Sequence, residues 1–133
     1  MIRSLSDQQC FELLTTTTIG RVGFASNSTF HILPVNFALS GREVIFRTSQ
    51  DGLIAARADV LEPVAFEVDY HDPLGAMGWS VLAQGLLSTA PVEDAAALGA
   101  RVNPWADPDR SLVLKYRITS VSGRAVRRET PVR

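Results

Sequence analysis

The sequence is almost without cysteine, because Cys10 is the only one among 133 residues. A single cysteine excludes an internal disulfide, and it also excludes a metal site built mainly from thiolates. A free cysteine commonly behaves as a small apolar residue and is buried. We therefore expect Cys10 to fill part of the core from a helix.

The sequence also lacks long apolar runs and an excess of either charge. No window approaches the ~18 consecutive apolar residues of a membrane span, and the N-terminus has no apolar signal-peptide segment. With 13 basic and 14 acidic residues, the chain lacks the basic surface typical of nucleic-acid binders. We therefore expect a cytoplasmic protein that binds neither membranes nor nucleic acids.

The chain does contain enough apolar material for a core. Hydrophobic residues make up 46% of the sequence, which suits one compact domain, and the length is too short for two. We expect a single domain over residues 1–133. Its core should cover about 4–122, and residues 123–133 should form a basic C-terminal tail.

The first segments of the chain predict a helix and then a strand. Ser6 and Gln9 form a capping-box pattern, which predicts a helix over about 7–15. The following stretch, TTTTIGRVGFAS, is rich in β-branched residues and predicts a strand. Gly20 and Gly23 interrupt this strand and indicate a bulge or a close backbone approach.

A hairpin and a short helix are predicted next. Two apolar runs over 29–38 and 43–48 are joined by a Ser-Gly-Arg turn, the pattern of a β-hairpin. Pro34 favours an edge position or a bulge, because proline cannot donate to a strand ladder. The composition of 52–58 favours a short helix, and PVAFEVDY, residues 63–70, predicts a further strand.

The second half of the chain adds two strands and one helix. GWSVLAQGLLSTA, residues 78–90, predicts a strand, and PVEDAAALGARV, residues 91–102, predicts a helix with acidic residues in its first turn. In the last predicted strand, 111–121, apolar and polar residues alternate. One face of it comprises Leu112, Leu114, Tyr116 and Ile118. Six strands with hairpin-length connections predict a mainly β protein, an antiparallel β-barrel with accessory helices.

The histidines give little support to a metal site. His71 lies beside Asp69 and Asp72 in VDYHDPLG, but one histidine on one loop is a weak ligand pattern. We expect the carboxylates of this segment to cap turns and expect no metal.

The stretch VIFRTSQDG predicts either an ordinary turn or a phosphate site. It ends a strand on Arg47 and continues with the hydroxyl residues Thr48 and Ser49 and then Gly52. A phosphate needs a guanidinium fork, hydroxyl donors and an approachable backbone, which these residues offer. The same residues are also common in solvated turns and helix caps, so the residues alone leave both interpretations open.

Five segments, taken together, resemble a known family. IGRVGF, ILPVNF, VIFRTS, VAFEVD and GWSVLAQG occur in the order and spacing of pyridoxamine 5'-phosphate oxidase-like flavoproteins, in their small actinobacterial-type branch. The resemblance covers about residues 4–122. It implies a six-stranded antiparallel split β-barrel that forms a homodimer with FMN at the subunit interface. The implied function is an FMN-dependent oxidoreductase acting on an unidentified small molecule.

The resemblance also implies a cofactor-binding set but no catalytic residue. Arg47 and Thr48 match the phosphate-holding stretch, the segment 34–36 matches the one beside the isoalloxazine ring, and the segment 79–80 matches the one that closes the site. The full set comprises Pro34, Val35, Asn36, Arg47, Thr48, Ser49, Gly52, Trp79 and Ser80. Arg124 matches a glycine-arginine position near the C-terminus, where it either contacts an anion or belongs to a solvated basic tail.

One departure from the family pattern leaves alternatives open. Gly52 is followed by Leu53 and Ile54, whereas similar sequences carry a small hydroxyl residue and then a lysine. Loss of a charge-assisted contact to phosphate costs about 1.5–3 kcal/mol, and Arg57 is a hypothetical substitute. The alternatives are a reductase that uses a deazaflavin coenzyme, and a non-catalytic flavin- or ligand-binding dimer with a degenerate phosphate site. The short C-terminal segment argues against pyridoxamine 5'-phosphate itself as the substrate.

Overall fold

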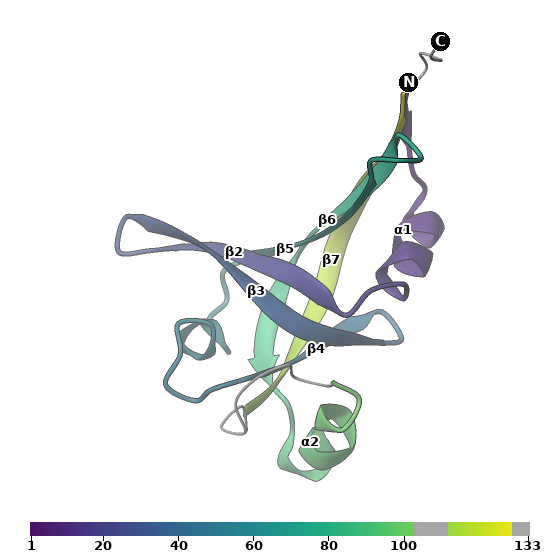
Figure 1. The fold of residues 1–133 in the computed structure, drawn as a ribbon. Helices are drawn as coiled ribbons and strands as arrows, with labels where there is room; N and C mark the ends of the chain where they lie inside the picture. Colours follow the sequence, from purple (N-terminus) through teal and green to yellow (C-terminus); the bar gives the residue numbers. More distant parts are fainter. Residues whose placement is uncertain (103–111, 129–133) are drawn as a thin grey trace.

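The computed structural model describes residues 1–102 and 112–128, which form a mainly β protein (Figure 1). The strands over these ranges are β1 (Ile2–Ser4), β2 (Ile19–Ser26), β3 (Thr29–Ser40), β4 (Glu43–Thr48), β5 (Val64–Asp72), β6 (Met77–Thr89) and β7 (Leu112–Arg127). The helices are α1 (Asp7–Leu14) and α2 (Val92–Gly99), with a short 3-10 helix η1 (Ala55–Arg57). Within the described ranges, no helix is both long and apolar enough to cross a bilayer.

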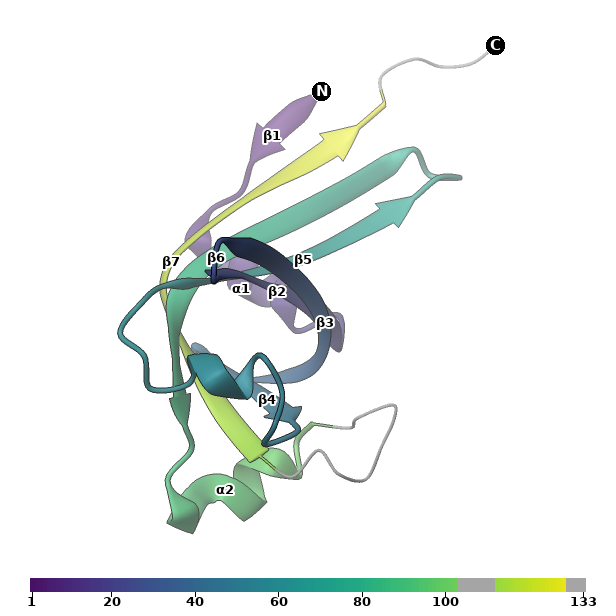
Figure 2. The same cartoon turned by 90° about the vertical axis from the view of Figure 1, so that its left-hand side faces the viewer.

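Six strands close into a ring, as the sequence predicts. The strand order is β7-β4-β3-β2-β5-β6, all pairs are antiparallel, and β6 pairs with β7 to close the barrel (Figure 2). The split-barrel prediction is confirmed. A further strand, β1, pairs with β7 outside the ring and was not predicted, because three residues are too few to show an alternating pattern.

Strands β5, β6 and β7 continue beyond the ring as an extension that we call the arm. It comprises residues 1–4, 69–80 and 120–127, and it projects from the barrel in Figures 1 and 2. Because β7 runs to Arg127, residues 123–127 of the expected basic C-terminal tail belong to a paired strand.

A β-bulge in β7 marks the base of the arm. Gln84 pairs with Ser120 and Gly85 pairs with Ile118, so Thr119 has no partner residue on β6. The Thr119 hydroxyl donates a hydrogen bond to the Gln84 carbonyl, at 3.1 Å. The predicted alternation in β7 therefore holds up to Ile118, and beyond the bulge the core-facing residues take odd numbers.

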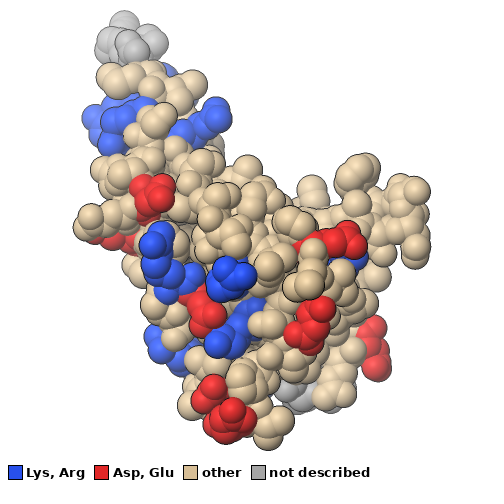
Figure 3. Space-filling view, turned by 180° about the vertical axis from the view of Figure 1, so that it is seen from behind, with Lys and Arg blue, Asp and Glu red and all other residues tan. Residues whose placement is uncertain are grey.

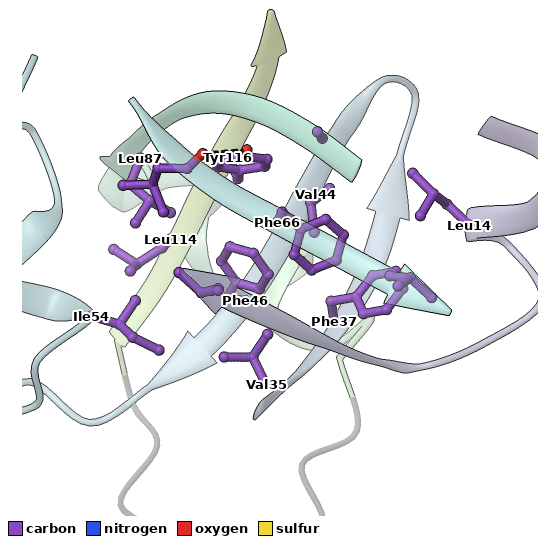
Figure 4. Packing of buried hydrophobic residues seen from close by; sticks show 14 of the residues in the cluster. Leu14, Val35, Phe37, Val44, Phe46, Ile54, Phe66, Leu87, Leu114 and Tyr116 are labelled. Carbon is purple, nitrogen blue, oxygen red and sulfur yellow. Dashed lines mark hydrogen bonds between the residues drawn. The ribbon is translucent and has the colours of Figure 1, made fainter. Parts of the chain in front are cut away.

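An aromatic cluster fills the barrel (Figure 4). The Phe66 ring is buried, and its centroid lies 5.1 Å from that of Phe37, 5.5 Å from that of Phe46 and 5.8 Å from that of Tyr116. A methyl group added at Gly20 would lie 2.6 Å from Phe66 Cε1, so the close approach predicted at Gly20 is confirmed.

The predictions for Gly23 and Cys10 had different outcomes. Gly23 pairs regularly with both neighbouring strands, and a methyl group there would meet Ala65 Cβ only at 3.8 Å, so the prediction of a bulge or close approach is wrong. Cys10 is fully buried in α1, as predicted, and this burial raises the pKa of its thiol.

The predicted helices are shorter in the structure. Both hydrogen bonds of the Ser6–Gln9 capping box are present, and α1 ends at Leu14. The predicted helix 52–58 is wrong in extent, because only the 3-10 turn η1 forms. Ile54, the residue before this turn, packs into the core and provides no side-chain cap.

The edge position predicted for Pro34 is confirmed. β3 pairs with β4 only from Phe37 onward, so Pro34 has a strand neighbour only on its β2 side. A missing N–H is tolerated there, because no second ladder needs it.

Tyr116 provides a test of the buried barrel wall. The Tyr116 hydroxyl donates to the Val64 carbonyl at 2.6 Å, and burial raises the pKa of Tyr116. We expect Tyr116→Phe to lower the free energy of unfolding by about 1–3 kcal/mol, because a buried carbonyl loses its partner. Urea denaturation at pH 8 measures this, and Tyr70→Phe at an exposed position should change little.

The raised pKa of Tyr116 also predicts a pH dependence. Above pH ~10 an unfolded tyrosine releases its proton, while the buried one retains it, so the unfolded state binds fewer protons and stability falls. This contribution approaches ~1.4 kcal/mol per pH unit and should be absent in Tyr116→Phe. If the parent protein and Tyr116→Phe lost the same free energy of unfolding between roughly pH 9 and pH 11, this expectation would be wrong.

Candidate functional site

Arg47 and Asn36 lie just beyond the point where the pairing of β3 with β4 ends. Val44 and Phe46 face the core, so the alternation of the strand directs Arg47 outward. The last β3–β4 pair before this point joins Phe37 to Phe46. The next residue on each strand, Asn36 and Arg47, therefore lies on the outer face where the two strands diverge.

Two hydroxyl groups flank Gly52 in the loop after β4. A methyl group added at Gly52 would lie 3.2 Å from Ser49 Oγ and 3.9 Å from Thr48 Oγ1. The Gly52 N–H donates to the Ser49 carbonyl at 3.2 Å, which holds the loop in a tight turn. The structure thus brings together three of the predicted residues, and a side chain at position 52 would crowd the Ser49 hydroxyl.

The Arg47 guanidinium lies against the C-terminal end of α2. Arg47 Nη1 donates to the Val102 carbonyl at 3.5 Å. Helix α2 packs on the outer face of the barrel through a small apolar cluster that includes Ile45 and Val113. Between this helix and the strands is a hollow of about 420 Å³ that Arg47 lines together with Gly99. The Arg47 side chain is thus placed between the end of β4 and helix α2, beyond the last pair of β3 with β4.

The position of the expected lysine is occupied by a core residue. The Ile54 side chain is 6% exposed and belongs to the main hydrophobic cluster, whereas Leu53 is 48% exposed. A charged group at 54 would have to leave this pocket or be buried in it. The departure from the family pattern is therefore built into the packing of the barrel end.

Arg57 lies one turn further along but points toward β2. Its side chain is 15% exposed, Nη2 pairs with Glu62 at 3.4 Å, and the guanidinium lies 5.7 Å from the Phe24 ring centroid. Its buried Nε has no hydrogen-bond partner among the described residues. The substitution of Arg57 for the missing lysine stays a prediction.

Trp79 and Ser80 are consecutive in β6 and lie on opposite faces of the arm. We call the face that carries Trp79 the inner face and the one that carries Ser80 the outer face. Trp79 stacks on Tyr70 with ring centroids 6.4 Å apart, and Ser80 pairs with Asp69 on one side and Arg124 on the other. Both residues nevertheless line one hollow of about 460 Å³ on the arm, together with Tyr70 and Arg124.

Next to the outer face of the arm, Arg21 forms ion pairs with two carboxylates, and the sequence did not predict this cluster. Arg21 Nη1 contacts Glu67 Oε1 at 2.9 Å and Asp69 Oδ1 at 3.3 Å. Burial, together with the neighbouring Asp69, raises the pKa of Glu67. A hollow of about 610 Å³ lies beside Glu67, Ser80 and Arg124. The shared face of Glu67 and Asp69 was visible in the sequence, but the pairing with Arg21 depends on the β2–β5 register.

The carboxylate of Asp72 caps a turn, as predicted. Asp72 Oδ1 accepts hydrogen bonds from the N–H groups of Leu74 and Gly75, both at 3.1 Å. Across residues 1–102 and 112–128, no three histidine, cysteine or carboxylate side chains are grouped as metal ligands would be.

The predicted site residues form two groups within one chain. The first lies at the end of β4, with Asn36 on the neighbouring strand, and the second lies on the arm with Ser80 and Arg124. In the ring, β2 and β5 separate β3 from β6, so Asn36 and Ser80 lie three strand spacings apart around the barrel wall. Pro34 faces outward beside Asn36, and Val35 is buried in the core.

Comparison with known proteins identifies relatives over most of the chain. A sequence model described as pyridoxamine 5'-phosphate oxidase matches residues 6–125. An uncharacterised Mycobacterium tuberculosis protein, Rv0080, is 29% identical over 124 residues, which cover 90% of this chain and 82% of the relative.

Two solved structures are also similar. The FAD binding protein from Mycobacterium smegmatis is 28% identical with a TM-score of 0.75, and the match covers 96% of this chain and 100% of that one. A FAD-binding protein from Mesorhizobium loti has a TM-score of 0.79 over 95% of this chain and 99% of its own, and at 21% identity it shows the fold alone.

Proposed function

Because this chain belongs to the pyridoxamine 5'-phosphate oxidase family, we propose that it is a cytoplasmic, homodimeric, flavin-dependent oxidoreductase acting on a small molecule. FMN is the proposed cofactor. The observation that carries the proposal is the pair of hydroxyls around Gly52, next to the strand end that positions Arg47. The FAD-binding relative that matches nearly the whole chain supports a flavin ligand.

The residues at the end of β4 fit a flavin phosphate. Thr48 and Ser49 supply hydroxyl donors, Arg47 supplies a guanidinium, and Gly52 leaves room for a phosphate oxygen to approach. When bound, the flavin would supply the electron transfer itself. The chain has to hold the phosphate, orient the ring and keep the substrate beside it. With Ile54 in place of a lysine, one cation is missing from this set.

A second copy of the chain would complete the site. The β4 group and the arm group lie at different levels of the same chain: Arg47 pairs with Val113 and Ser80 pairs with Arg124, so about 30 Å of β7 separates the two levels. In the proposed dimer, the outer face of one arm lies over the β4 group of the other subunit. Ser80 and Arg124 would then contact the ligand from the partner side, while Thr48 and Ser49 hold the phosphate.

Removal of the loop hydroxyls tests the proposal. We expect FMN to bind with micromolar affinity, and we expect Thr48→Val and Ser49→Ala each to weaken binding about tenfold, because each removes a donor to a charged group. Titration followed by quenching of flavin fluorescence measures the affinity. Ser88→Ala, an exposed hydroxyl on β6, is the matched control and should leave the affinity unchanged. Equal affinities in all four proteins would place the flavin elsewhere.

The buried Ile54 favours a second candidate, a non-catalytic ligand-binding dimer with a degenerate phosphate site. The same titration distinguishes the two candidates. If FMN does not bind at about 50 μM, roughly −6 kcal/mol, the flavoenzyme proposal fails. Binding of a reduced deazaflavin coenzyme to a colourless protein would instead identify a deazaflavin-dependent reductase.

A further inference from the structure

The inner face of the arm encloses a pocket that the proposed flavin site does not use. Its volume is about 380 Å³, within the range typical of small-molecule sites. The residues that matter for its chemistry are Arg3, Leu5, Leu13, Trp79, Ala125 and Arg127. They come from β1, from α1 and the residue just before it, and from β6 and β7, so elements far apart in the sequence build one hollow.

The strand register determines what each wall presents. Trp79 pairs with Ala125, and Ala125 pairs with Arg3, so these residues form one row across the inner face. In the next row, Arg127 pairs with Met77. Because the Ala125 side chain is small, it leaves a depression in the sheet surface between the Trp79 indole and the Arg3 side chain. An aromatic ring therefore borders this depression on one side and a guanidinium borders it on the other.

Helix α1 provides the apolar side of the pocket. Leu5 and Leu13 both line the pocket and pack against the main core cluster, which holds them in place. Trp79 packs against the same cluster and stacks on Tyr70. The apolar walls are thus rigid parts of the fold.

The positive charges of the pocket are not neutralised by the described residues. Neither Arg3 nor Arg127 has a carboxylate within ion-pair distance on the described part of the chain. Asp72, opposite Met77 on β5, uses Oδ1 to cap its own turn. Figure 3 shows basic side chains gathered toward the free end of the arm, and the basic residues of this part of the sequence are all arginines. An anion at this end of the pocket would meet two guanidinium groups.

We propose that this pocket binds an apolar carboxylate. The apolar body of the ligand lies between the Trp79 indole and the leucine side chains of the α1 wall. Its carboxylate pairs with Arg3 and Arg127, whose forked donors match the two oxygens. Arg3 and Arg127 lie on the face opposite Ser80 and Arg124, so the cations of this site are not those of the proposed flavin site.

Calorimetric titration of the full chain with 2-naphthoate tests the site. We expect measurable binding below about 1 mM, and 2-naphthalenemethanol, which has the same body without the charge, should bind at least tenfold more weakly. The double variant Arg3→Gln/Arg127→Gln should weaken naphthoate binding at least tenfold. Arg117→Gln, an exposed arginine on the barrel part of β7, is the matched control and should leave binding unchanged.

A second variant tests where naphthoate binds without altering the charge of the pocket. Ala125→Leu fills the space between Trp79 and Arg3 and should abolish naphthoate binding, although both arginines remain. In contrast, the affinity for FMN should be the same in these variants as in the parent protein, which separates this site from the flavin site. The proposal is overturned if naphthoate does not bind at about 1 mM. It is also overturned if the neutral alcohol binds equally well, or if the arginine pair and Ala125→Leu both leave binding unchanged.

Discussion

Replacing Phe66 with alanine is expected to lower the free energy of unfolding by about 3–5 kcal/mol. The Phe66 ring lies at the centre of the barrel, where its neighbours Phe37, Phe46 and Tyr116 come from three other strands. The barrel is closed by backbone pairing on every side, so it cannot collapse fully into the space that the ring leaves. The loss is large against the about 5–15 kcal/mol that stabilises a typical domain.

Urea denaturation followed by circular dichroism measures this loss. Phe30→Ala provides the matched control, because the Phe30 side chain is 85% exposed and its removal should change the free energy of unfolding by less than about 0.5 kcal/mol. Similar losses for the two substitutions would mean that the ring cluster does not carry the stability of the barrel.

Placing a lysine at position 54 should be nearly as damaging. Ile54→Lys removes a core side chain and introduces a charge without a partner, so we expect a loss of about 3 kcal/mol or more. In contrast, Leu53→Lys changes a side chain that is half exposed beside the same loop. We expect it to leave stability nearly unchanged and to tighten FMN binding about tenfold, which corresponds to about 1.4 kcal/mol.

Thermal melts and flavin titrations on the two lysine variants measure these effects separately. Leu61→Lys adds the same charge at an exposed position after η1 and should alter neither quantity. If Ile54→Lys is as stable as the parent protein, position 54 is not a structural part of the core. If Leu53→Lys binds FMN no better, the cation deficit of the loop does not limit affinity.

The barrel could be predicted because its signals are local. The hairpin 29–48 and the alternation from Leu112 to Ile118 each depend on neighbouring residues, and the family resemblance implied the closed barrel. The loop proposed to hold a phosphate is also local, since Thr48, Ser49 and Gly52 lie within one turn.

What could not be predicted depends on register between distant segments. The partnership of Arg21 with Glu67 exists only because β2 and β5 pair at those residues. The pocket beside Trp79 needs β1 and α1 to meet β7, which no single segment indicates. The family motif groups Trp79 with Ser80, whereas the neighbours of each side chain depend on how β6 pairs with β5 and β7.

The bulge at Thr119 has a consequence for how members of the family evolve and are aligned. Deleting this residue would remove the bulge and restore unbroken alternation along β7, so Arg124 and Ala125 would keep the faces that they have now. A homologue without the extra residue therefore presents equivalent chemistry beyond this point with one residue fewer. An alignment gap placed elsewhere in β7 would equate side chains that face opposite sides of the arm.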